Sequence, residues 1–165
     1  MSDFDPSILR PGHCIVDMPD WWNPVDLIIS AKTWTKCCHT RVYVGGNQVV
    51  QAILKGVDIY PFEVNGIGGV LEPLFPFDLG AAMSWFYSKA KGQGYDVLSL
   101  FKFYGWGRNP SNQNRMICSE FATRFYRAGG GHPFNPADDA DMIAPAQFCQ
   151  TAGFRFVWQS PKMPV

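Results

Sequence analysis

Short runs of β-branched and apolar residues characterise the first third of the chain, whereas apolar residues at helical spacing characterise most of the rest. The short runs, bounded by Gly, Pro or Asn, predict strands at residues 13–17, 37–44, 48–54, 57–60 and 154–158. Helix-start residues and apolar stripes predict helices at 23–32, 78–91, 94–104, 117–128 and 145–151. Strands followed by helices and one last strand indicate an α+β fold.

Three segments have distinct local patterns. Gly45-Gly46-Asn47 separates two predicted strands, as is typical of a β-hairpin. Positions 117, 121, 125 and 128 form the most regular apolar stripe, and Gly129 follows it directly. Residues 62–76 are rich in Gly and Pro and therefore predict an irregular connection.

Length and composition favour one globular domain spanning residues 1–165. The chain is 47% hydrophobic and 17% charged with a formal net charge of zero, which argues against disorder and against nucleic-acid binding through phosphate neutralisation. No stretch approaches the roughly 20 apolar residues of a membrane span, and the start of the chain lacks a signal-peptide pattern. These features favour a cytoplasmic protein without a stable membrane anchor, and a phage-encoded origin also fits them.

The five cysteines are an odd number and, in a cytosolic setting, are expected to be reduced. Zinc sites commonly use Cys-x-x-Cys or His-x-x-x-His spacing, which this sequence lacks, so we predict no metal and no cofactor. Cys37 and Cys38 are adjacent on a predicted strand and would point to opposite faces, with Cys37 on the face of His39. Both are therefore predicted to be packing residues rather than joint members of one site.

Cys118 is the candidate nucleophile because it lies in the first turn of the predicted helix 117–128. Unpaired backbone N–H groups and the helix dipole favour a thiolate at that position. A buried packing cysteine is the alternative, since free cysteines are among the most buried residues.

A reactive thiol needs a base, and the sequence offers His13, His39 and His132. Only His39 is predicted on a rigid hairpin with a second polar candidate, Gln51, twelve residues later. A three-residue loop, 45–47, would pair Arg41 with Gln51 and place Gln51 diagonally from His39 on one face. A two-residue loop, 46–47, would turn Gln51 to the opposite face, so the loop length tests the hypothesis.

Two stretches, "HTRVYVGGNQVVQA" and the later "MICSEFATRFYRAGG", resemble the circularly permuted NlpC-type papain-like cysteine hydrolases, a group that includes the lecithin retinol acyltransferase relatives. Weaker similarities extend the coverage over most of the chain; they are "LRPGHCIV", "GQGYD" and "ADDADMIAPAQF". In that family a strand histidine, a polar residue twelve positions later and a helix-opening cysteine form the site. His39, Gln51 and Cys118 stand at those positions.

The resemblance implies a permuted papain-like fold and acyl transfer through a thioester on Cys118. His39 would then be the general base, Gln51 would orient it, and Tyr95 would contact the substrate or the oxyanion, with a core tyrosine as the alternative. The family pattern usually has Asp at the position of His13 and Glu or His at that of Gln51. An amide cannot stabilise an imidazolium as a carboxylate does.

The resemblance leaves three functions open. Amide hydrolysis of a cell-wall or related peptide is favoured, and lipid acyl hydrolysis or acyl transfer is the second reading. An apolar mouth for lipid could come from aromatic residues at 21–22, 101–104 and 106. A catalytically weak binding module on the same fold is the third.

Overall fold

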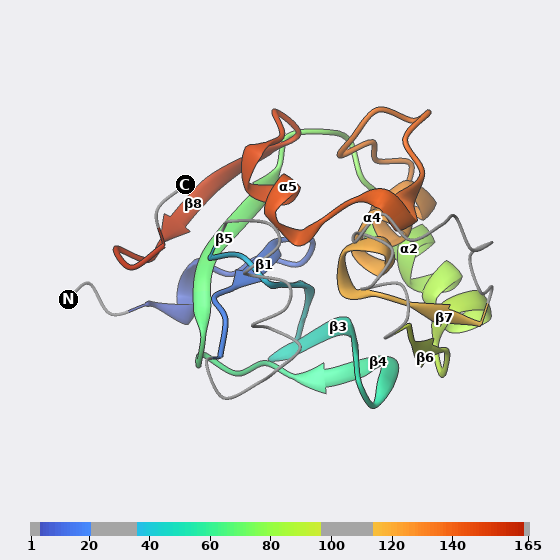
Figure 1. Cartoon of the computed structure of the whole chain (residues 1–165), viewed down its shortest axis with the longest axis horizontal. Coiled ribbons are helices and arrows are strands. Elements are labelled where there is room, and N and C mark those ends of the chain that lie inside the picture. The colour runs from blue at the N-terminus through green and yellow to red at the C-terminus, as the bar shows by residue number, and fades with distance from the viewer. Residues whose placement is uncertain (1–3, 21–35, 97–113, 164–165) are drawn as a thin grey trace, which may run out of the picture.

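The computed structural model describes residues 4–20, 36–96 and 114–163 (Figure 1). The predicted helix at 23–32, most of the one at 94–104 and the aromatic residues of the predicted apolar mouth lie outside these ranges. The described start of the predicted helix 94–104 is wrong, because Gly94–Tyr95 forms a strand.

A six-stranded antiparallel sheet forms the centre of the described fold. Its spatial order is β4-β3-β2-β1-β5-β8, so the first strand lies inside the sheet. The strands are β1 (Cys14–Asp17), β2 (His39–Gly45), β3 (Gln48–Ile53), β4 (Gly56–Pro61), β5 (Ile67–Pro73) and β8 (Phe154–Gln159). The α+β class predicted from the sequence is therefore confirmed.

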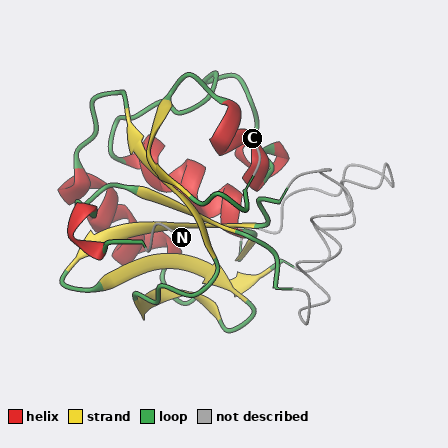
Figure 2. Cartoon of the chain, turned by 90° about the vertical axis from the view of Figure 1, so that its left-hand side faces the viewer, coloured by secondary structure: helices red, strands yellow, loops and turns green. Residues whose placement is uncertain are grey.

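Short helices accompany the sheet, and Figure 2 shows most of them above the curved strands. They are the 3-10 helices η1 (Pro6–Ile8) and η3 (Ala140–Met142), the α-helices α2 (Leu79–Trp85), α4 (Cys118–Ala128) and α5 (Pro145–Gln150), and the π-helical η2 (Phe86–Ala90). As predicted, Asp78 caps α2, since its carboxylate accepts a hydrogen bond from the Ala81 N–H at 3.1 Å. The helices predicted at 78–91, 117–128 and 145–151 are confirmed.

Each face of the sheet has its own hydrophobic cluster, because successive strand side chains point to opposite faces. On β1, Cys14 and Val16 belong to the larger cluster, which includes Phe121 and Phe125 of α4. Ile15, between them, belongs to the smaller cluster with Val49 and Val70. Helix α4 is thereby packed on one face of the sheet, against β2 and β3.

The predicted irregular connection at 62–76 is wrong, because β5 occupies Ile67–Pro73 between β1 and β8. The glycines that suggested a loop are instead required by packing. A Cβ on Gly69 would lie 2.6 Å from the ring of Phe156 on the neighbouring strand, and one on Gly68 would collide with Met163. Side chains from adjacent segments thus fill the space above this central strand.

The β2–β3 hairpin combines features of both predicted loops. Gly46 and Asn47, with φ of 59° and 58°, form a two-residue turn closed by the pairing of Gly45 with Gln48. A bulge at Gly45 then shifts the register, so that Tyr43 pairs with Val49 and Val42 with Val50. Gln51 therefore has the register expected for the three-residue loop, although the turn itself has two residues.

The adjacent cysteines Cys37 and Cys38 precede β2, which begins at His39 and not at residue 37 as predicted. Both are buried in the larger hydrophobic cluster, which agrees with the packing role predicted for them. Their thiols donate hydrogen bonds to the carbonyl oxygens of Pro145 (3.3 Å) and Asp17 (3.4 Å), respectively. The strand-face argument for Cys37 therefore does not apply, because this residue is not in the strand.

Candidate active site

Helix α4 places Cys118 at its first position, after the N-cap residue Ile117. Ile117 offers no side-chain cap. Instead, the buried carboxylate of Glu120 accepts a hydrogen bond from the Ile117 N–H and forms an ion pair with Arg124 at 2.9 Å. This arrangement is one half of a capping box and fixes the helix start. The Cys118 sulfur, 1% exposed, consequently lies at the positive end of the helix dipole.

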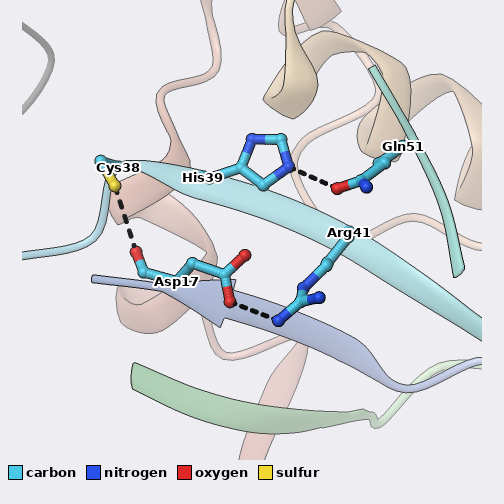
Figure 3. A network of polar contacts seen from close by, with 5 residues as sticks. All are labelled: Asp17, Cys38, His39, Arg41 and Gln51. Carbon is cyan, nitrogen blue, oxygen red and sulfur yellow. Dashed lines mark hydrogen bonds and ion pairs between the residues drawn. The ribbon is translucent and has the colours of Figure 1, made fainter. Parts of the chain in front are cut away.

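His39 is the first residue of β2, and its imidazole contacts Gln51 of β3 (Figure 3). The His39 Nε2 atom lies 2.7 Å from Gln51 Oε1. An amide oxygen can only accept a hydrogen bond, so Nε2 carries the hydrogen and donates it. This tautomer leaves the other ring nitrogen, Nδ1, for proton exchange, and in Figure 3 that nitrogen points away from Gln51.

Cys118 and His39 influence each other's protonation. Burial raises the pKa of the Cys118 thiol, but the charge of His39 and its hydrogen bond to the sulfur outweigh burial and lower this pKa. Burial likewise lowers the pKa of His39, yet the charge and hydrogen bond of Cys118, the charge of Asp17 and the hydrogen bond of Gln51 raise it to about 9. Both shifts favour a thiolate–imidazolium pair near neutral pH.

Thr40 adds two donors beside the same sulfur. Its hydroxyl is completely buried and has no hydrogen bond of normal geometry within the described residues. The backbone N–H and the hydroxyl of Thr40 nevertheless both lower the pKa of Cys118. A thiolate accepts hydrogen bonds better than a thiol does, so the Thr40 hydroxyl is best satisfied when Cys118 is ionised.

Thr40→Val is expected to destabilise the ionised form of Cys118, because it removes the hydroxyl while keeping the shape of the side chain. One lost hydrogen bond of about 1 kcal/mol moves the pH midpoint of Cys118 alkylation upward by roughly 0.7 unit. The pH dependence of the iodoacetamide reaction measures this midpoint. Thr40→Ser keeps the hydroxyl and should match the parent protein; equal midpoints for the Val and Ser variants would contradict the assignment.

Comparison with known proteins adds no assignment. No protein-family model matches the chain, and no curated protein matches it.

Tyr95 lies near the start of α4 without a demonstrated role in the site. It belongs to β6 (Gly94–Tyr95), whose parallel pairing with β7 (Arg115–Met116) places Tyr95 beside Met116. Its side chain is 8% exposed and packs in the larger hydrophobic cluster. This position fits the core-tyrosine alternative, and the oxyanion role stays a prediction.

The other two histidines lie apart from the His39–Gln51 pair. His13 precedes β1, is buried, and its Nδ1 accepts a hydrogen bond from the Arg10 N–H at 3.3 Å. Burial lowers the pKa of His13, which favours its neutral form. His132 is exposed in the segment after α4. Of the three histidines considered from the sequence, the structure brings only His39 together with Gln51.

Among residues 4–20, 36–96 and 114–163, no three His, Cys, Asp or Glu side chains gather as a metal site would require. No helix in this part of the chain has the length and apolarity needed to cross a bilayer.

Sequence reasoning missed Asp17, which lies beside His39 on the neighbouring strand. The two residues are Cα partners in the β1–β2 register, and Asp17 Oδ1 forms an ion pair with Arg41 Nη2 at 2.8 Å. The signal available in the sequence was weak: Asp17 ends a predicted strand, but nothing local specifies which strand pairs with it. Thr40 was missed for a related reason, since only the packing of α4 brings its polar groups to Cys118.

Proposed function

We propose that this protein is a cysteine hydrolase in which Cys118, His39 and Gln51 form the catalytic triad. The observation that carries the proposal is a helix-opening cysteine that hydrogen-bonds a strand histidine, whose Nε2 in turn donates to Gln51 at 2.7 Å. The mutual pKa shifts of Cys118 and His39 support it, because packing cysteines have no reason to be ionised. Cys14 and Cys37 illustrate the difference, since burial and neighbouring thiols raise their pKa.

The fold we propose is the permuted NlpC-type papain-like one. An antiparallel sheet that carries His39 and Gln51, next to a helix that presents Cys118, is what the sequence resemblance implies. The order His39, Gln51, Cys118 along the chain also agrees with it.

The proposed reaction proceeds through a thioester. The Cys118 thiolate attacks the carbonyl carbon of an amide, and the Cys118 backbone N–H helps to hold the resulting oxyanion. The tetrahedral intermediate collapses as His39 Nδ1–H protonates the departing amine, leaving an acyl group on the sulfur. Neutral His39 then removes a proton from water as the water attacks the thioester carbonyl. The carboxylic acid is released with the sulfur leaving as thiolate, so the thiolate–imidazolium pair is restored.

A catalytically weak binding module is the second candidate, and two observations favour it. Gln51 provides no negative charge to stabilise an imidazolium, and Cys118 is only 1% exposed. Under this reading the site would hold a peptide or acyl group without turning it over.

A comparison of the parent protein with Cys118→Ala on three substrate classes tests the proposal. Muropeptides, p-nitrophenyl acyl esters and phospholipid vesicles represent amides, activated esters and lipids. We expect hydrolysis of at least the muropeptides or the esters by the parent protein, with loss of more than 1,000-fold on substitution, because the nucleophile is removed. Hydrolysis confined to phospholipid would favour a lipid acyl hydrolase, and no Cys118-dependent turnover on any class would favour the binding module.

A further inference from the structure

A carboxylate adjoins His39 from the side opposite Gln51. Strand β2 lies between β3, which carries Gln51, and β1, which carries Asp17 (Figure 3). Asp17 and His39 are cross-strand partners, and the Cα atoms of such partners are about 5 Å apart. The Asp17 side chain is 16% exposed, so solvent screens its charge only partly.

Arg41 fixes the position of this carboxylate. Its guanidinium, 6% exposed, donates from Nη2 to Asp17 Oδ1 at 2.8 Å and lies 5.5 Å from the ring centre of Phe62. Arg41 follows His39 by two residues on β2, so β1 and β2 together specify the arrangement of all three side chains. The ion pair is therefore a fixed part of the surroundings of His39.

The reaction has a stage at which His39 lacks an anionic partner. In the resting enzyme the Cys118 thiolate balances the imidazolium. Once the sulfur has attacked the carbonyl carbon, its negative charge passes to the oxyanion, while His39 must stay protonated to donate to the leaving amine. Gln51 is neutral and supplies only a hydrogen bond. A permanent negative charge near His39 would stabilise the imidazolium at this stage.

We propose that Asp17, held in place by Arg41, is a positioning residue that supplies the negative charge stabilising protonated His39 when Cys118 is uncharged. This inference rests on the proposed hydrolase function. It assigns to Asp17 the stabilisation of the imidazolium that a carboxylate would provide if one stood at position 51.

The charged groups around His39 are few among the described residues. Cys118 faces it from α4, Asp17 from β1 and Arg41 from its own strand, while Gln51 of β3 is uncharged. The positive charge of Arg41 offsets part of the effect of Asp17. The net influence of the pair on the imidazole is therefore smaller than that of an isolated carboxylate, yet of the same sign.

A histidine titration followed by NMR tests the inference without any need for catalysis. In Cys118→Ala, which lacks the thiolate, Asp17→Asn is expected to lower the midpoint of the His39 titration by about 0.5 to 1 pH unit. The signal of His39 is assigned by its loss in His39→Ala. If the folded Asp17→Asn protein titrates at the same pH as its parent, the inference is wrong.

Asp58 provides a matched control on the other side of the site. It is the β4 partner of Gln51 and forms an ion pair with Lys91 at 3.4 Å, but both side chains are nearly half exposed. Solvent screening should leave the His39 midpoint unchanged to within about 0.2 pH unit in Asp58→Asn. An equal shift for both aspartates would show a general charge effect and would overturn the assignment to Asp17.

A double variant covers the case in which Asp17→Asn leaves buried Arg41 unpaired and the protein unfolds. Asp17→Asn with Arg41→Gln removes both charges, and the His39 midpoint should still fall, by a smaller amount. An unchanged or higher midpoint contradicts the inference. Failure of the hydrolase proposal has a different signature, namely absence of Cys118-dependent turnover in the unmodified protein, which this titration does not measure.

Discussion

His39→Ala is expected to lower the rate of Cys118 alkylation by iodoacetamide at pH 6 by about 30-fold or more. Without the imidazolium, burial makes the pKa of the thiol at least as high as that of an ordinary cysteine, about 8.5, so roughly one molecule in 300 is ionised at pH 6. The more basic thiolate is a better nucleophile and recovers roughly tenfold of this loss. The remaining deficit measures the contribution of the ion pair.

The pH dependence gives the same prediction a second readout. In the parent protein the alkylation rate should vary less between pH 6 and 8, because the lowered pKa of Cys118 keeps more of the thiol ionised across this range. In His39→Ala it should rise about tenfold per pH unit until the ordinary thiol pKa is reached. Iodoacetamide suits the experiment because it is small and the Cys118 side chain is nearly enclosed. Exposed His132 is the control position, and parallel profiles for His39→Ala and His132→Ala would refute the ion pair.

Phe121→Ala is expected to reduce the free energy of unfolding by about 3 to 5 kcal/mol. Phe121 is completely buried on α4, one turn after Cys118, and its ring contacts those of Phe86 and Phe125 at centroid distances of 6.2 and 5.8 Å. Alanine would leave a cavity between α4 and α2 that these aromatic rings cannot close. A domain typically has only about 5 to 15 kcal/mol of stability, so the loss is large.

Urea denaturation followed by circular dichroism measures this change. Leu74→Ala is the control, because Leu74 is 56% exposed and its truncation should change the free energy of unfolding by no more than about 0.5 kcal/mol. A loss below about 1 kcal/mol for Phe121→Ala would mean that the interface between α4 and α2 does not stabilise the fold as the packing indicates.

Local sequence signals predicted the elements that local rules determine. The apolar stripe after Ile117 and the cap at Asp78 specify helices without reference to the rest of the chain, and both helices occur where they were expected. Strand β5 was missed because its glycines indicate a loop by every local rule. Glycine is required at positions 68 and 69 because Met163 and Phe156, about 90 residues later, occupy the space that a Cβ would need.

The residues of the candidate site likewise fall into those that were predicted from the sequence and those that only tertiary contacts bring together. The association of His39 with Cys118 came from the family resemblance, since no periodicity relates residues 79 positions apart. Asp17 and Thr40 were not predicted at all, because strand pairing and helix packing bring them to His39 and Cys118. The position of Gln51 was predicted only in part. Hairpin rules gave the two-residue turn and the observed register as separate alternatives, and they did not include the bulge at Gly45 that allows both to occur together.

The bulge at Gly45 gives an exposed turn control over the register of β3. Surface turns usually accept an inserted or deleted residue at little cost. Here the bulge itself sets the register. If Gly45 continued the ladder without a bulge, Val44 would pair with Val49 and Val42 with Gln51, every side chain of β3 would exchange faces, and Gln51 would leave the imidazole. The position of Gln51 beside His39 is thus maintained at a turn that touches neither side chain, and a change that abolished the bulge would alter the site as directly as replacing one of its members.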